Sequence, residues 1–292
     1  PVVPPGSGRL NIIARNENAA PMPSSGSRSR GISFFTLLTA MSQTGSIAAL
    51  LGIEGGHALE GRLDKLDHFA RRGVRYLGLC HFSANELCFP AYGRGRRDSD
   101  GLTRFGRDVV DRAGDLGVVV DLAHINKRGF LDACELSRFP PIVSHTGVLG
   151  AFEHWRNIDD EQLRTVADKG GIVGVIFCPR YLGGDGIEPV VKHLRHIVDV
   201  CGEDAPALGS DWDGFIIPTK GLCDASRLPL LTDGLLAGGR FELLSSLQDY
   251  AAEHLRTPDR FAASGPSMLQ ATQARHGAWF AWWRKHGVRN RR

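Results

Sequence analysis

Gly117-Val-Val-Val-Asp-Leu122 is a short segment, rich in β-branched residues and almost continuously apolar, that gives the first indication of the fold. A run of this kind is typical of a parallel β-strand that is buried on both faces. Five similar runs occur along the chain, at residues 47–53, 76–79, 141–144, 171–177 and 207–210. The sequence therefore predicts a parallel sheet.

Segments with helical spacing of apolar residues lie between these runs. They cover residues 59–72, 104–116, 127–137, 159–169 and 187–201. Repeated strand–helix units favour a parallel sheet with right-handed crossovers, and six or more such units are typical of a closed barrel. The predicted fold class is α/β, with a (β/α)8 TIM-type barrel, and a length of 292 residues accommodates one such domain.

The character of the sequence changes near both ends of the chain. Residues 1–45 are rich in Ser, Arg, Pro, Gly and Asn and are predicted to be an atypical, loosely ordered leader. Residues 46–239 carry the barrel pattern. Residues 240–292 contain three of the five tryptophans and a basic end, and we expect them to be an atypical tail of partly helical character.

Composition excludes several classes of function. The net charge is only +3 and the basic residues gather near the two ends, so the sequence predicts no nucleic-acid partner. The apolar segment at residues 32–51 is interrupted by polar residues, and we expect neither a membrane span nor a signal peptide. The six cysteines form no C-x-x-C pair, which predicts reduced, mostly buried thiols and a cytoplasmic location.

Ionisable residues directly follow five of the six apolar runs. They are Glu54, His81, His124, His145 and Asp211. Because the carboxyl ends of parallel barrel strands meet on one face, these side chains are expected to lie close together. Neutral imidazoles and a carboxylate are ligands that Zn²⁺ accepts, so a metal site formed by Glu54, His124 and His145 follows on chemical grounds.

Four motifs carry a resemblance to a known family. They are Ile53-Glu-Gly-Gly56, Val120-Asp-Leu-Ala-His124, Val143-Ser-His145 and Gly209-Ser-Asp-Trp-Asp-Gly214. Together with their spacing, and with Arg156 placed 11 positions after His145, they resemble the renal (membrane) dipeptidase family, peptidase family M19. The resemblance covers about residues 47–239. It implies a metallo-dependent hydrolase-like barrel, a homodimer being one possible assembly, and zinc-dependent hydrolysis of a dipeptide substrate.

The resemblance also implies roles for individual residues. Glu54 would bridge two zinc ions, and His124 and His145 would complete the second of them. His81 would polarise the substrate carbonyl, and Arg156 would bind the carboxylate at the substrate's C-terminus.

Three aspartates belong to the same motifs. The resemblance implies that Asp211 handles the proton of the attacking water. Asp121 and Asp213 are expected to orient the metal ligands.

Two features depart from the family pattern. The H-x-D pair that holds the first zinc upstream of the glutamate is missing, since no histidine precedes His57. The expected closing helix does not follow residues 228–239 either. We therefore expect a barrel that is incomplete at both ends, as in a shortened or frame-disrupted gene product.

Three interpretations of function remain open from the sequence. The first is a zinc dipeptidase. The second is a degenerate homologue that binds one zinc or none, and the third is another TIM-barrel amidohydrolase. His193 and His196, three positions apart in a predicted helix without a carboxylate partner, are interpreted as surface or packing residues.

Overall fold

The computed structural model describes residues 50–237. The chain divides into two compact units at Thr219, so the described parts are residues 50–219 of the first unit and residues 220–237 of the second. The predicted leader, the predicted tail and both predicted domain boundaries lie outside the described residues.

The first unit is built on a six-stranded sheet in which every strand is parallel to its neighbours. The spatial order of the strands is the same as their order in the sequence. The strands are β1 (Leu51–Glu54), β2 (Val74–Gly78), β3 (Val119–Asp121), β4 (Ile142–Thr146), β5 (Ile172–Val175) and β6 (Pro206–Leu208). A sequential parallel order of this kind is that of a TIM-type barrel, which confirms the predicted fold class.

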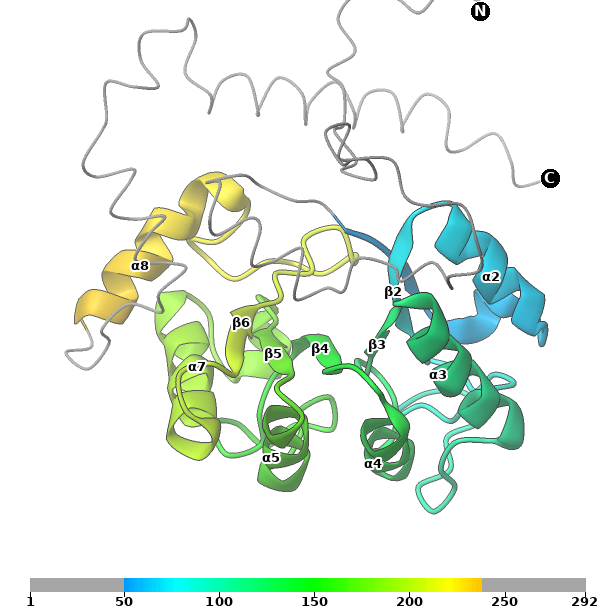
Figure 1. The fold of residues 1–292 in the computed structure, drawn as a ribbon. Coiled ribbons are helices and arrows are strands. Elements are labelled where there is room, and N and C mark those ends of the chain that lie inside the picture. The colour runs from blue at the N-terminus through cyan, green and yellow to red at the C-terminus, as the bar shows by residue number, and fades with distance from the viewer. Residues whose placement is uncertain (1–49, 238–292) are drawn as a thin grey trace, which may run out of the picture. The chain divides into compact units, whose positions relative to one another are not determined.

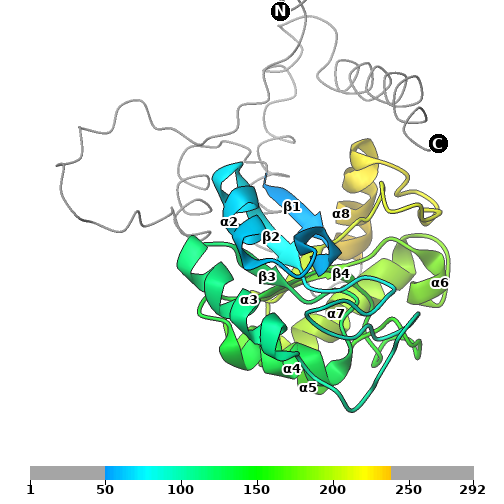
Figure 2. The same ribbon diagram turned by 90° about the vertical axis from the view of Figure 1, so that its right-hand side faces the viewer.

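Helices follow the strands and pack on the outer side of the sheet, as Figure 1 shows for α3, α4, α5 and α7. The helical elements are η1 (Gly56–Leu59), α2 (Leu63–Arg71), α3 (Arg104–Leu116), α4 (Lys127–Leu136), α5 (Asp160–Asp168), α6 (Pro179–Leu182) and α7 (Ile187–Cys201). Neighbouring helices contact each other in sequence order from α2 to α5, and α5 then contacts α7 (Figure 2). The described part of the second unit holds η2 (Ala225–Arg227) and α8 (Leu228–Ala237).

Polar side chains fix the points at which three of the helices begin. Thr103 accepts a hydrogen bond from the backbone N–H of Gly106 at the start of α3, and Asn126 accepts one from Gly129 at the start of α4. Asp159 forms a reciprocal capping box with Gln162 at the start of α5. Such caps satisfy backbone donors that the helix leaves without partners.

The core lies between the strands and the surrounding helices. Side chains that are fully buried include Leu77 of β2, Val173 of β5, Phe130 of α4, Leu163 of α5 and Ile197 of α7. These positions belong to the apolar runs and the helical stripes that the sequence predicts. Four of the six cysteines are buried and none forms a disulfide, as expected of reduced thiols.

The predicted and observed elements differ at one notable boundary. The sequence predicts a helix from residue 59, whereas α2 begins at Leu63. Glu60 and Gly61 both adopt positive φ angles, 49° and 67°, and this left-handed turn separates η1 from α2. Among residues 50–237, no helix combines the length and the apolar character that crossing a bilayer requires.

Gly209, which follows β6, allows an unusually close approach to β4. Its backbone N–H donates to the carbonyl of Val175, and a Cβ atom at this position would lie 2.2 Å from the carbonyl oxygen of Ser144. The same Cβ would lie 2.9 Å from the Cα of His145. Because both obstacles are backbone atoms, the strands would have to move apart to admit a side chain.

Gly209→Ala is therefore expected to lower the free energy of unfolding by about 1–3 kcal/mol, the usual cost of overpacking. Chemical denaturation of the purified protein measures this difference. Gly114→Ala is the matched control, since a Cβ there meets only the flexible side chain of Arg138 and alanine favours the helix. Equal stability of the two variants would show that the backbones at Gly209 and β4 are not packed too closely to admit a side chain.

Candidate functional site

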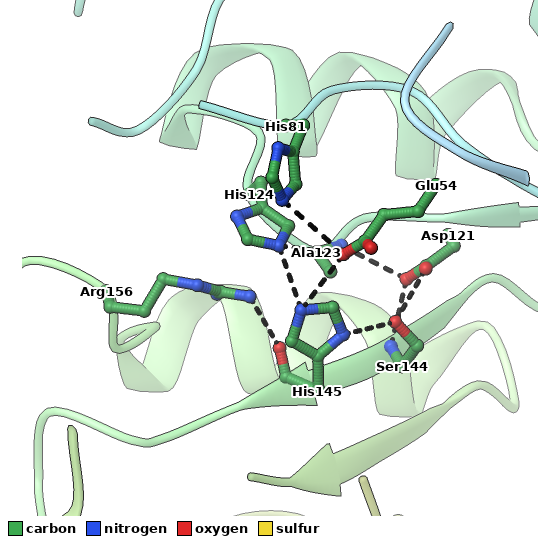
Figure 3. A network of polar contacts seen from close by, with 8 residues as sticks. All are labelled: Glu54, His81, Asp121, Ala123, His124, Ser144, His145 and Arg156. Atoms are coloured by element: carbon green, nitrogen blue, oxygen red, sulfur yellow. Dashed lines mark hydrogen bonds and ion pairs between the residues drawn. The ribbon is translucent and has the colours of Figure 1, made fainter. Parts of the chain in front are cut away.

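Four of the predicted site residues meet at the carboxyl ends of neighbouring strands. Glu54 is the last residue of β1, and His145 lies inside β4. His81 and His124 lie three positions beyond the last residues of β2 and β3. Figure 3 shows their side chains pointing toward one another.

Three donor atoms form a compact triangle. The Nε2 atom of His124 lies 3.1 Å from Oε1 of Glu54 and 2.8 Å from Nε2 of His145, and Nε2 of His145 lies 3.3 Å from the same oxygen. Tetrahedral zinc with bonds of about 2.0–2.1 Å separates neighbouring ligand atoms by roughly 3.3 Å. The identities and spacing of these three atoms therefore fit a bound metal ion.

His81 lies at the open side of this triangle. Its Nε2 atom is 3.9 Å from Oε1 of Glu54, and its ring centroid is 4.4 Å from that of His124. Ligand atoms of Glu54, His81 and His124 all lie within 4.8 Å of one another. With 42% of its side chain exposed, His81 can reach either the metal position or a molecule bound beside it.

Burial keeps two of the imidazoles neutral. Desolvation, reinforced by the positive charge of Arg156, lowers the pKa of His124 to about 2 and that of His145 to about 2. A neutral imidazole has a free lone pair, which is the form that binds a metal ion. Both histidines are thus ready ligands at neutral pH.

A buried aspartate orients His145 through Ser144. Asp121 is 1% exposed, and its carboxylate accepts the backbone N–H groups of Ala123 and Ser144 and, at 2.6 Å, the hydroxyl of Ser144. Because that hydroxyl donates its proton to Asp121, its oxygen accepts from Nδ1 of His145 at 2.9 Å. The tautomer so fixed turns the lone pair of Nε2 toward Glu54 and His124.

Two candidate residues are held in the left-handed backbone region. His124 has φ 68° and Asp211 has φ 58°. A non-glycine residue pays about 1–2 kcal/mol for this conformation. Such strain concentrates at functional sites, where the surrounding structure enforces it. The backbone carbonyl of His124 accepts a hydrogen bond from the backbone N–H of Ala91, which links this turn to the loop after β2.

Arg156 lies beside the cluster and is almost wholly buried, with 4% of its surface exposed. Its Nη2 donates to the carbonyl of His145 at 2.8 Å, whereas its Nε has no hydrogen-bond partner in the described part of the chain. No carboxylate within residues 50–237 forms an ion pair with it, and desolvation lowers the pKa of the guanidinium. A buried cation of this kind favours an anionic ligand. It lines a cavity of about 390 Å³ together with His124.

Asp211 and Asp213 differ in their surroundings. Asp211 is partly buried after β6, and its pKa is raised to about 6 by burial and then by the negative charge of Glu54. Asp213 is exposed, and no hydrogen bond within residues 50–237 joins it to the candidate ligands, unlike Asp121. Of the two aspartates predicted to orient ligands, the structure thus places only Asp121 in the network.

The two histidines interpreted as packing residues differ as well. His193 of α7 is fully buried, where its Nδ1 accepts the backbone N–H of Val148 and its Nε2 donates to the carbonyl of Leu182. It thereby supports the loop after β4. His196 lies 2.7 Å from a carboxylate oxygen of Asp160, so the expectation that it lacks a carboxylate partner is wrong.

Some residues that support the site without contacting its three donor atoms could not be predicted from the sequence. Ser144 belongs to the motif Val143-Ser-His145, but only the structure shows that it joins Asp121 to His145. Asn85 donates to the carbonyl of Leu79 and accepts from the backbone of Leu87, which fixes the loop that carries His81. Asparagine is typical of such turns, and its presence at position 85 is the sequence feature that could have indicated this role.

The family model named Membrane dipeptidase (Peptidase family M19) matches residues 29–243. The chain belongs to this family. The match covers most of the chain and confirms the resemblance carried by the motifs.

Relatives of known name or structure agree with this assignment. An uncharacterised dipeptidase of Schizosaccharomyces pombe is 36% identical over 188 residues, which are 63% of this chain and 46% of the relative. This chain therefore spans about half the length of that protein.

Two solved structures share the fold. A metallopeptidase from Rhodobacter sphaeroides, bound to a phosphinate mimic of the dipeptide L-Ala-D-Ala, is 31% identical, with a TM-score of 0.64 over 72% of this chain and 62% of the other. An amidohydrolase from Pseudomonas aeruginosa is 27% identical, with a TM-score of 0.63 over 71% of each chain.

Burial of His193 makes stability depend on pH. Desolvation lowers its pKa from 6.5 to about 4, with Lys192 and His196 as the nearby positive groups. The unfolded chain therefore binds the extra proton first, and stability falls as the pH drops from about 6.5 to 4, by up to about 3 kcal/mol. His193→Gln is expected to flatten this slope in urea titrations across that range. An unchanged slope would contradict the assignment.

Ser144→Ala is expected to weaken binding of a divalent metal ion at the donor triangle by roughly 10-fold or more, since His145 loses its orienting partner. Calorimetric titration of the metal-free protein with Zn²⁺ measures the affinity. Ser137→Ala is the control, because that buried hydroxyl bonds only the carbonyl of Ala133 at the end of α4. Wild-type affinity in both variants would exclude the orienting role.

Proposed function

We propose that this protein is a zinc-dependent dipeptidase, which hydrolyses the peptide bond of a dipeptide with a metal-activated water. The observation that carries the proposal is the position of a buried guanidinium, without an anionic partner among residues 50–237, directly beside a triangle of metal-type donors. A buried arginine or a cluster of metal-type donors, taken alone, is compatible with many different functions. Together they suit a small substrate that has a reactive carbonyl and a free carboxylate.

The metal would be held by Glu54, His124 and His145, with His81 close enough to contribute. Two imidazoles and a carboxylate suit Zn²⁺ among the common divalent ions. A bound ion of this type supplies Lewis acidity, which makes water more acidic and polarises a carbonyl group. The second oxygen of Glu54 is available for a further ion, in line with the bridging role that the family resemblance implies.

Arg156 would bind the carboxylate at the C-terminus of the substrate. The planar guanidinium makes two charge-assisted hydrogen bonds to a carboxylate, and its unsatisfied Nε shows that donor capacity remains. Its Nη2 already contacts the backbone of His145, itself a candidate metal ligand. A substrate held at both anchors would have its scissile carbonyl at the metal and its C-terminal carboxylate at Arg156, which suits a dipeptide.

His81 and Asp211 would serve the reacting groups. His81 lies at the open side of the donor triangle, where an imidazole N–H can donate to the substrate carbonyl oxygen. Asp211 would accept the proton of the attacking water. Both roles follow from the family resemblance.

The comparisons support a dipeptide as substrate. The Rhodobacter sphaeroides metallopeptidase, which shares the fold, holds a mimic of L-Ala-D-Ala. The Pseudomonas aeruginosa amidohydrolase, which also shares the fold, favours a second candidate, in which the barrel hydrolyses an amide that lacks a carboxylate. The buried Arg156 separates the two, because a substrate without a carboxylate would leave this cation unpaired.

Purified protein supplied with Zn²⁺ is expected to hydrolyse Ala-Ala, to lose activity with a chelator and to regain it with zinc. Arg156→Met keeps the bulk of the side chain but removes its charge. It is expected to lower kcat/KM for Ala-Ala by roughly 30-fold or more, the usual effect of breaking a buried charge pair. Ala-Ala amide, which has no carboxylate, should be an equally poor substrate for both proteins.

Arg107→Met is the matched control, because this arginine pairs with Asp132 on the outer helices. It should leave kcat/KM for Ala-Ala unchanged. Hydrolysis of the amide as fast as the dipeptide would favour the amidohydrolase interpretation. Zinc binding without any turnover would identify a catalytically impaired homologue.

A further inference from the structure

Three aromatic side chains form a continuous surface that leads away from the donor triangle. The ring of Phe82 lies 4.6 Å from that of His81 and 4.7 Å from that of His124, edge to face. Trp155 lies 6.3 Å from Phe82, again edge to face, and stacks on Tyr92 at 4.1 Å with an interplanar angle of 23°. We call Phe82, Tyr92 and Trp155 the aromatic wall.

The aromatic wall is not part of the core. Phe82 is 37% exposed and Tyr92 is 49% exposed, while Trp155 is half-buried. Large aromatic side chains left accessible next to a site are typical of ligand recognition, because each offers apolar area at a small cost in conformational entropy. Tyr92 covers one face of Trp155 and so restricts the orientation of the indole.

The cavity beside Arg156 continues this apolar surface. Trp155, Leu149, Ile158 and Leu122 contribute to its lining, next to His124 and Arg156. The charged side chains of the same cavity pair with one another, Arg96 with Asp98 at 2.6 Å and Lys127 with Asp159 at 2.6 Å. Arg156 therefore remains available for a carboxylate, and Trp155 and the aliphatic side chains of the lining offer apolar contact beside it.

Chain connectivity determines which part of a substrate would meet Trp155. This residue directly precedes Arg156, so the indole and the carboxylate anchor belong to the same turn of backbone. In an amino acid the side chain branches from the carbon next to the carboxylate. A substrate whose C-terminal carboxylate binds Arg156 would thus place its C-terminal side chain, and not its N-terminal one, against Trp155.

We propose that the aromatic wall makes this site selective for dipeptides whose C-terminal residue has a large apolar or aromatic side chain. The proposal rests on the proposed function for the position of the substrate carboxylate. Trp155 supplies the contact, and Tyr92 and Phe82 hold it in place. Burying such a side chain is expected to improve kcat/KM by roughly 10- to 100-fold over alanine.

The kinetic test compares Ala-Phe with Ala-Ala as substrates of the zinc-loaded full chain. Wild-type protein is expected to prefer Ala-Phe by at least about 10-fold, and Trp155→Ala should reduce this ratio to near one. Trp155→Phe should retain part of the preference. Phe152→Ala is the matched control, since Phe152 is similarly exposed, stacks on His154 and does not line the cavity.

A binding test separates this proposal from the proposed function. Phosphinate mimics of Ala-Ala and Ala-Phe, in both configurations at the C-terminal residue, are titrated calorimetrically into wild-type protein and the same variants. Tighter binding of the Ala-Phe mimic to wild type and Phe152→Ala, but not to Trp155→Ala, supports the aromatic wall even if no dipeptide is hydrolysed. Equal affinities in wild type, a preference that survives in Trp155→Ala, or binding of neither mimic overturns it.

Discussion

The parallel, sequential order of the six strands is the constraint on which the site depends. Since each of β1 to β5 is followed by helical segments that return the chain to the starting edge of the next parallel strand, the carboxyl ends meet on one face. Glu54 and His145, 91 positions apart in the sequence, come within 3.3 Å of each other for this reason. Gly209 contributes to this arrangement, because it lets the chain after β6 approach the backbone of β4 at Ser144 and His145.

Desolvation then gives these residues their chemical character. Burial keeps His124 and His145 neutral and therefore able to bind a metal ion, and it leaves Arg156 as a cation in need of an anion. The buried carboxylate of Asp121 is stabilised by three hydrogen bonds, and through Ser144 it fixes the tautomer of His145. A single network thus provides hydrogen bonds to a buried carboxylate and orients a candidate metal ligand.

Much of the fold and of the donor cluster could be predicted from the sequence. An apolar run indicates a buried strand, and a Glu or His directly after the run indicates a site residue at the carboxyl end of that strand. The runs before His124 and His145 gave the strands, and the barrel topology implied that their ends would meet. The aromatic wall could not be predicted in this way, since Tyr92 and Trp155 lie in irregular loops and are 63 positions apart. Likewise, the carboxylate partner of His196 comes from α5, and only packing of α5 against α7 brings them together.

The central claim is that Glu54, His124 and His145 bind one metal ion beside a carboxylate site at Arg156. The most direct test is a crystal structure of the zinc-loaded protein with a dipeptide phosphinate, with anomalous data collected on both sides of the zinc edge. We expect an anomalous peak about 2.0–2.2 Å from one atom of each of these three side chains, with the ligand carboxylate on the guanidinium of Arg156. A zinc ion bound elsewhere, or a carboxylate directed away from Arg156, would contradict it.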